Sequence, residues 1–237
     1  MARSFQKRLP EPVPGESPVN PVPAVILALF LAIAGIEAIL SLGGMGLAGG
    51  PAAVGWRVGL LERFAFSPAV LEQVLQGHWG DMSLLLRFVS YAFLHGSVTH
   101  ALFAGALLLA LGKFVGEEMG QGATLAVFIA ATIGGALAFG AFAVDTQPLF
   151  GSYPGIYGLI GAFTYLLWLR LGRTGENRLK AFRLIGGLLA VQLLFGALFG
   201  ANPQWIADIG GFVAGLAAAT VFAPGGWAAL RQRLRAR

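Results

Sequence analysis

The sequence predicts an all-α integral membrane protein, a bundle of six transmembrane helices with a long amphipathic first loop. Three observations of composition support this class. Of the 237 residues, 57% are hydrophobic and only 11% are charged, and the mean hydropathy is +0.74. Soluble domains carry about a quarter of their residues as charged side chains. The chain also contains 35 glycines, many within apolar runs, where small residues let transmembrane helices pack closely.

Six apolar stretches are long enough to cross the hydrocarbon core, which requires about 20 helical residues. They cover residues 24–42, 98–115, 123–144, 155–171, 182–200 and 206–222. Residues 1–23 precede them as a tail whose six prolines disfavour helix and favour an extended chain. Residues 43–85 are too polar and too rich in Gly and Pro to span, but their aromatic and aliphatic side chains predict short interfacial helices. Residues 223–237 form a basic C-terminal segment.

The positions of Lys and Arg predict the orientation in the membrane. Thirteen of the 16 basic residues lie in the two terminal segments and in two of the loops on the same side, and three, Arg57, Arg63 and Arg87, lie on the opposite side. The positive-inside rule therefore places both termini in the cytoplasm. We expect a multi-pass protein of the plasma (inner) membrane, surrounded by lipid. The net charge of +5 reflects this topology, so nucleic acid is not an expected partner.

Few side chains are available for chemistry. The chain has no cysteine, which excludes disulfides, thiol catalysis and Cys-ligated metals. Ionisable residues within apolar stretches are functional candidates, because inserting one costs about 3 kcal/mol. The candidates are Glu37, His95, His100 and Asp208, together with the loop hydroxyls of Ser152 and Tyr153.

Simple structural roles are available for several of these candidates. Glu37 is expected to pair with backbone or hydroxyl groups of a neighbouring helix, and His95 to anchor a loop through a hydrogen bond. His95 and His100 are five residues apart, about 140° around a helix, so they are not expected to share a metal ion. We therefore expect neither a metal site nor a cofactor.

Small residues predict which helices pack closely. Gly155 and Gly158 fall on one face of the stretch 155–171, and Gly211 and Gly215 on one face of the stretch 206–222. Such faces let two helix backbones approach each other in a membrane. We expect these two helices to pack together and to bring Ser152, Tyr153 and Asp208 near one membrane face.

Three motifs resemble the rhomboid family of intramembrane serine proteases. The run from Arg87 through His95 to His100 resembles the family's R…H…HxxxN segment at the second helix. GIYGLIGAF, from Gly155, is similar to the segment after the family's nucleophile, and IGGFVAGL, from Ile209, to its sixth helix. The resemblance covers nearly the whole chain and implies a rhomboid-like bundle over residues 24–222.

The same resemblance implies that the protease site is degenerate. The family's GxSG motif falls on Gly151 to Pro154, which puts Tyr153 at the position of the nucleophile and displaces the serine to Ser152. Asp208 stands where the family has its catalytic histidine. His100 of HxxxN is kept, but Ala104 replaces the asparagine that helps to bind the oxyanion. A carboxylate is a much weaker base than imidazole, and losing an oxyanion donor typically costs about a hundredfold or more in rate.

These substitutions leave alternatives at two positions. Ser152 is either a turn residue or a displaced nucleophile that uses His100 as its base. Asp208 either caps its helix or forms a buried polar latch with Tyr153 or His100, because a buried carboxylate without donors is costly.

The sequence as a whole favours a rhomboid-like pseudoprotease that binds transmembrane segments of partner proteins, as an adaptor, a chaperone or an accessory subunit of a membrane complex. One alternative is a rhomboid-type endopeptidase with a site rearranged around Ser152, His100 and Asp208. A second alternative is a small transporter with Glu37 and Asp208 as ion ligands, against which the absence of an internal inverted repeat argues.

Overall fold

The computed structural model describes residues 21–144, 147–199, 202–224 and 226. Most of the predicted N-terminal tail and of the basic C-terminal segment lies outside these residues. The described residues form the following helices, where η marks a 3-10 helix. They are α1 (Ala24–Gly44), η1 (Pro51–Gly55), α2 (Trp56–Phe64), α3 (Pro68–Leu75), α4 (Met82–Ser90), η2 (Tyr91–Phe93), α5 (Val98–Met119), α6 (Gln121–Phe142), α7 (Tyr153–Arg173), η3 (Arg178–Phe182), α8 (Arg183–Phe199) and α9 (Trp205–Phe222).

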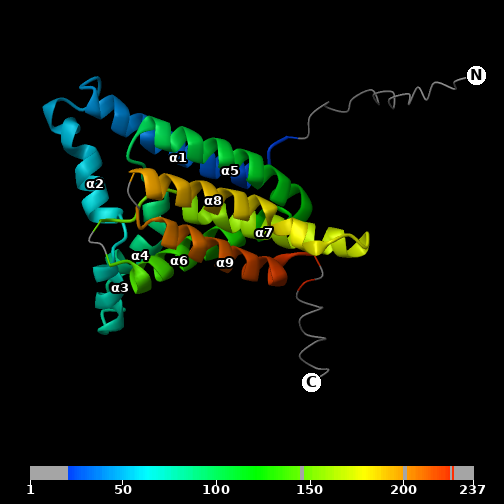
Figure 1. Ribbon diagram of the computed structural model, residues 1–237. Helices are drawn as coiled ribbons and strands as arrows, with labels where there is room; N and C mark the ends of the chain where they lie inside the picture. Colours follow the sequence, from blue (N-terminus) through cyan, green and yellow to red (C-terminus); the bar gives the residue numbers. More distant parts are fainter. Residues whose placement is uncertain (1–20, 145–146, 200–201, 225, 227–237) are drawn as a thin grey trace, which may run out of the picture.

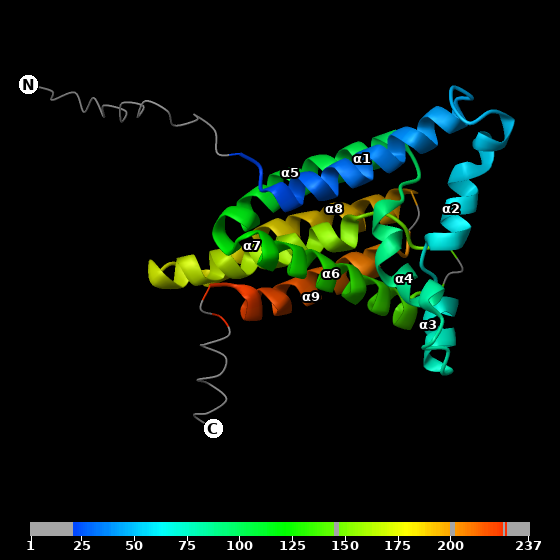
Figure 2. The same cartoon turned by 180° about the vertical axis from the view of Figure 1, so that it is seen from behind.

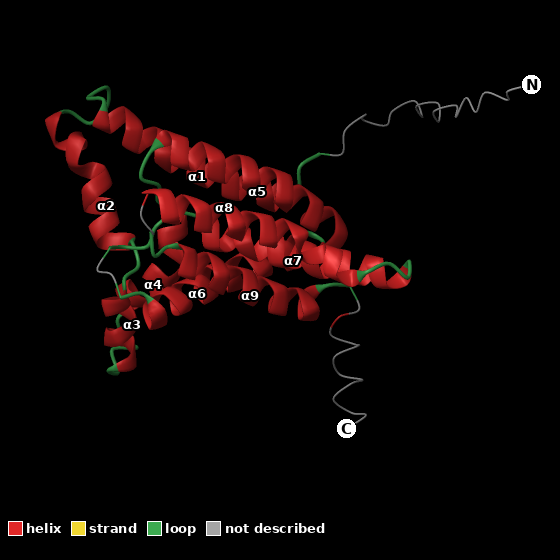
Figure 3. Ribbon diagram, viewed as in Figure 1, coloured by secondary structure: helices red, strands yellow, loops and turns green. Residues whose placement is uncertain are grey.

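The long helices confirm the predicted all-α bundle (Figures 1 and 3). Five of them, α1, α5, α6, α7 and α9, are long and apolar enough to cross a membrane. The remaining expected span, residues 182–200, is represented by α8, which is 17 residues long. Its end at Phe199 adjoins residues 200–201, which lie outside the described part of the chain.

Helix α7 occupies the centre of the bundle. Of its most apolar window 56% is buried, whereas the corresponding share is between 28% and 39% in the other four spanning helices. Helices α6 and α9 pack closely against α7 and against each other, and α1 packs on α5 at a second side (Figures 1 and 2). The main apolar core joins Phe128 of α6, Leu108 of α5 and Ile156 of α7.

Glycines allow the backbones of α7 and α9 to touch. A Cβ atom on Gly215 would collide with the backbone of Gly158, and one on Gly211 would collide with the backbone of Pro154. Gly155 instead faces α6, where an added Cβ would meet the ring of Phe128. The close approach therefore fixes the height of α9 relative to the start of α7, which is the part of α7 that bears Tyr153.

The first loop folds into short helices at one end of the bundle, where α2 and α3 run across the long helices (Figures 1 and 2). The Asp81 side chain caps α4 by accepting a hydrogen bond from the Ser83 amide at 2.9 Å. Phe66 is fully buried and meets the Phe88 ring at 4.8 Å between centroids. Phe66 also exchanges two backbone hydrogen bonds with Leu149, at 3.0 and 2.8 Å, which attach the first loop to the chain leading into α7.

Helix α8 exposes several apolar side chains among its described residues. Its close neighbours are η3 and the adjoining part of α7. The apolar side chains of Leu184, Val191, Leu194 and Leu198 are exposed on it. η3 itself is held beneath α7 by an edge contact between Phe182 and Trp168, with ring centroids 5.8 Å apart.

Candidate functional site

The loop before α7 is fixed from both sides. The Gly151 amide donates a hydrogen bond to the Tyr91 carbonyl at 3.0 Å. Gly151 has a φ of +107°, a conformation that side chains other than glycine rarely adopt. A Cβ atom there would also lie 3.0 Å from the His100 ring. Glycine is thus required both by the backbone conformation and by the close approach of the imidazole.

Ser152 follows directly and is paired with His95. Its hydroxyl oxygen lies 3.3 Å from His95 Nε2, and the Ser152 amide donates to the same nitrogen at 3.4 Å. Both residues are buried: Ser152 has no exposed surface and His95 is 1% exposed. Because the amide can only donate, Nε2 is the acceptor and the ring proton of the neutral imidazole resides on Nδ1.

Burial makes the His95 ring a weak base. Loss of hydration lowers the pKa of His95 from 6.5 to about 4, and the neighbouring His100 contributes to the same shift. His95 is therefore neutral near pH 7. An imidazole with so low a pKa accepts a proton from a serine hydroxyl poorly.

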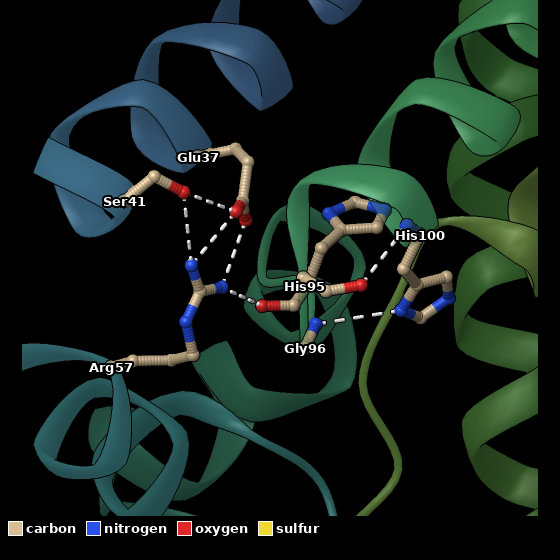
Figure 4. Close-up of polar contacts among 7 residues, drawn as sticks. Glu37, Ser41, Arg57, His95, Gly96 and His100 are labelled. Carbon is tan, nitrogen blue, oxygen red and sulfur yellow. Dashed lines mark hydrogen bonds and ion pairs between the residues drawn. The ribbon is translucent and has the colours of Figure 1, made fainter. Parts of the chain in front are cut away.

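His100 and Tyr153 stack beside this pair. The two rings lie 5.2 Å apart between centroids with an interplanar angle of 14°, and the His95 ring meets the edge of His100 at 4.9 Å. The Gly96 amide donates weakly to His100 Nδ1 at 3.4 Å, as drawn in Figure 4. The expected separation of the two histidines around one helix is wrong, because α5 begins at Val98 and His95 lies in the loop before it.

Asp208 lies on α9 and takes its partner from α8. The side chain is 6% exposed, and Oδ2 accepts a hydrogen bond from Gln192 Nε2 at 2.8 Å. The expected latch placed this carboxylate on Tyr153 or His100, but neither donates to it among the described residues. Asp208 does not cap α9 either, since the helix begins at Trp205 after Gln204, and Asp208 lies within its first turn.

Glu37 forms the strongest polar contact of the site. Arg57 Nη2 and Nη1 donate to its two carboxylate oxygens at 2.7 and 2.9 Å, and the Ser41 hydroxyl donates at 2.8 Å (Figure 4). Arg57 also donates to the carbonyl of His95. The hydrogen bond to Glu37 is the main cause that raises the pKa of Arg57. The expected partners were groups of a neighbouring helix; the observed ones are a cation of the first loop and a hydroxyl of α1 itself.

Ala104 stands at the position of the asparagine that would help to bind an oxyanion, and its side chain provides no hydrogen-bond donor. Ala104 of α5 is fully buried, and its side chain can neither donate nor accept. The Ser152 amide, a further candidate donor, is directed at His95. Pro154, the second residue of α7, lacks an amide hydrogen altogether. This part of the site is therefore poorly equipped to stabilise a developing negative charge.

Three contacts of the site were not found from the sequence. Gln192 was read only as part of an apolar helix, Arg57 only as a topology signal, and His95 was not connected with Ser152. One usable signal existed for His95: Ser97 caps α5 and accepts from the His100 amide at 3.2 Å. A serine three residues before His100 is typical of a helix start, which would have placed His95 outside the helix.

The comparisons with known proteins agree with this architecture. The Rhomboid domain family matches residues 83–225, more than half of the chain. The rhomboid protease GluP of Bacillus subtilis (strain 168) is 28% identical over 158 residues, which cover 65% of this chain and 28% of that protein. The chain therefore matches only a minor part of that relative's length. With its spanning helices and this family match, the protein is an integral membrane protein and belongs to the rhomboid family.

Proposed function

We propose that this rhomboid-family protein does not hydrolyse peptides and that it binds transmembrane segments of partner proteins, as an adaptor, a chaperone or an accessory subunit of a membrane complex. The observation that carries the first half is the state of Ser152, which is fully buried with its hydroxyl toward His95. A buried hydroxyl offers a substrate carbonyl no line of attack unless the loop rearranges.

The neighbouring groups support the absence of hydrolysis. Tyr153 stacks on His100. A phenol has a pKa near 10 in water, so it needs a strong base to become a nucleophile. Asp208 could serve as that base only as a carboxylate, and it already accepts a hydrogen bond from Gln192.

Helix α8 supports the second half of the proposal. Its apolar side chains have few protein neighbours, and its polar link to α9 is the contact between Gln192 and Asp208. A partner helix could pack against the exposed Val191, Leu194 and Leu198 side chains, since van der Waals packing drives helix association in membranes.

A crosslinking experiment tests the binding role. A photoreactive amino acid at Val191 or Leu194 of α8, in native membranes, should yield adducts with specific membrane proteins identified by mass spectrometry. The same probe at Leu31 of α1, which is similarly exposed, is the matched control. Equal adducts from both helices, or lipid adducts alone at α8, would contradict binding at α8.

The alternative of a rearranged protease is favoured by one observation, the contact between Ser152 and His95. It differs from the site expected from sequence, since His95 replaces His100 as the neighbour of the serine. A fluorophosphonate probe distinguishes the two functions: we expect no labelling of the purified protein. Labelling that disappears in Ser152→Ala would establish a reactive serine and overturn our proposal.

We further propose that both termini are cytoplasmic and that the protein resides in the plasma (inner) membrane. The support is the distribution of basic residues: Arg57, Arg63 and Arg87 all lie on the loop helices at the end of the bundle opposite the start of α1 (Figure 1). A reporter fused after Arg237 should read cytoplasmic and one inserted near Gly77 exterior. The reverse pattern would refute this orientation.

A further inference from the structure

A cavity lies at the end of the bundle where α5, α7 and α9 finish, away from the Ser152 loop. Its volume is about 560 Å³. Residues of the three helix ends form its walls: Phe114 and Glu118 of α5, Leu166, Leu169, Arg170 and Arg173 of α7, and Ala223 after α9. By the predicted orientation this end faces the cytoplasm.

Two arginines line this cavity, and within the described part of the chain neither forms an ion pair. Arg170 and Arg173 are exposed, and neither has an acidic partner among the described residues. They are three residues apart on α7, so they project from the same side of its last turn. Other basic groups of the adjoining loop are engaged: Lys180 pairs with Glu176 at 2.9 Å, and Arg178 lies over the ring of Trp168.

The remaining walls define what kind of anion fits. Phe114, Leu166 and Leu169 make the cavity apolar beside the guanidinium groups, so it suits a molecule with both a phosphate and hydrocarbon chains. Guanidinium groups bind phosphate oxygens through paired hydrogen bonds. Glu118 is the one acidic group on the walls, and its carboxylate can accept hydrogen bonds from headgroup hydroxyls. A free inorganic phosphate would leave the apolar walls unfilled.

We propose that this cavity binds an anionic glycerophospholipid of the phosphatidylglycerol class. Arg170 and Arg173 hold its phosphate, the glycerol hydroxyls face Glu118, and an acyl chain lies along Phe114 and Leu166. Basic pockets between transmembrane helices at the cytoplasmic side are a common setting for anionic lipid headgroups. This site is separate from the Ser152 region. It rests on the proposed orientation of the chain and does not depend on the proposed binding of transmembrane segments.

Native mass spectrometry of the full, delipidated chain in detergent tests the proposal. The probes are phosphatidylglycerol, phosphatidylcholine with the same acyl chains, and inorganic phosphate. The variant Arg170→Gln/Arg173→Gln should bind phosphatidylglycerol about tenfold more weakly, because each basic group near an anionic headgroup contributes severalfold to affinity. The single variant Arg173→Gln should give an intermediate loss and is used if the double variant does not fold.

A matched control removes the same charge from the same face. In Lys180→Gln/Arg183→Gln neither altered residue lines the cavity, and binding should stay within about twofold of the parent. Equal losses in both double variants would mean general surface charge and would overturn the site. Equal binding of phosphatidylcholine, or inorganic phosphate binding as tightly as the lipid, would overturn the assignment of the ligand.

Discussion

Two buried carboxylates join pairs of elements in this protein, and they do so in different ways. Glu37 connects α1 to α2 through Arg57, which donates to both carboxylate oxygens, with a further hydrogen bond from Ser41. Asp208 connects α9 to α8 through one amide, that of Gln192. Their exposures are nearly the same, 4% and 6%.

This difference means that the contact between α1 and α2 is harder to open than the contact between α8 and α9. Removing a cation from a buried ion pair strands a charge, so the contact between Glu37 and Arg57 resists opening. A single neutral amide donor can be exchanged for another donor, since the carboxylate then loses one hydrogen bond and gains one. Among the described residues, the helix that carries this amide, α8, packs mainly against η3 and α7. The contact between α8 and α9 is therefore more easily opened than the one between α2 and α1.

The largest expected effect is at the ion pair. Arg57→Met should lower the free energy of unfolding by about 3 kcal/mol, because it leaves the Glu37 carboxylate buried without a cation. Unfolding in mixed micelles, followed by circular dichroism, measures this change. Arg63→Met, six residues further along α2 and exposed, is the control and should stay within about 0.5 kcal/mol. Equal losses in both variants would remove the distinction between the two carboxylates.

The pH dependence of the free energy of unfolding tests the region around Arg57 and His95. The carbonyl of His95 accepts a hydrogen bond from Arg57. The pKa of His95 is lowered to about 4 in the folded protein against 6.5 for an ordinary histidine. Between these values the unfolded chain binds the additional proton, so stability is complete above about pH 6.5 and falls as the pH falls toward 4. The loss over this window should be about 2–3 kcal/mol, since one pKa unit corresponds to about 1.4 kcal/mol.

The control for that titration is the exposed His78. In His95→Gln the decline between pH 6.5 and 4 should become shallower, whereas His78→Gln should leave it unchanged. A decline of the same size in all three proteins would assign the acid sensitivity to groups other than His95.

A smaller effect is expected at the second carboxylate. Asp208→Ala should cost about 1–2 kcal/mol, because Gln192 then keeps a buried amide without an acceptor. Asp208→Asn should cost less, since its amide oxygen still accepts. Micelle unfolding of both variants beside Arg57→Met measures the difference. A loss at Asp208→Ala as large as that at Arg57→Met would contradict a releasable contact at α8.

The sequence allowed the membrane spans to be predicted, but not the contacts between helices. Hydrophobic length fixes each span locally, because every backbone group in the bilayer must be satisfied within its own helix, and the spans at α1 and α9 were predicted nearly to the residue. Arg57, the cation that pairs with Glu37, and Gln192, the donor to Asp208, lie 20 and 16 residues away in other elements. Which donor meets which carboxylate depends on how the helices sit against one another, and no spacing within one helix encodes that.

In the candidate site, too, the position of residues was predicted better than the contacts between them. The small-residue faces of two helices predicted that Tyr153, Ser152 and Asp208 lie near one another, and the resemblance to the family identified Ala104 as the residue in place of the asparagine. It did not reveal that His95 turns back toward Ser152, which requires the chain to leave helical geometry before Val98.

The smallest effect is expected where a protease would be most sensitive. Ser152→Ala should change the free energy of unfolding by no more than about 0.5 kcal/mol, because its hydroxyl makes one long contact, 3.3 Å to His95 Nε2. That nitrogen keeps the Ser152 amide as a donor in the variant. Gly151→Ala, one residue earlier, is the contrasting substitution and should cost about 1–2 kcal/mol, because alanine is strained at a φ of +107° and its methyl group would press on the His100 ring. Thermal unfolding of the two variants in detergent, with growth of cells that carry each, provides the comparison. A loss of cellular function in Ser152→Ala with stability intact would show that the hydroxyl acts in chemistry, and the buried pair of Ser152 and His95 would then have to open toward a substrate.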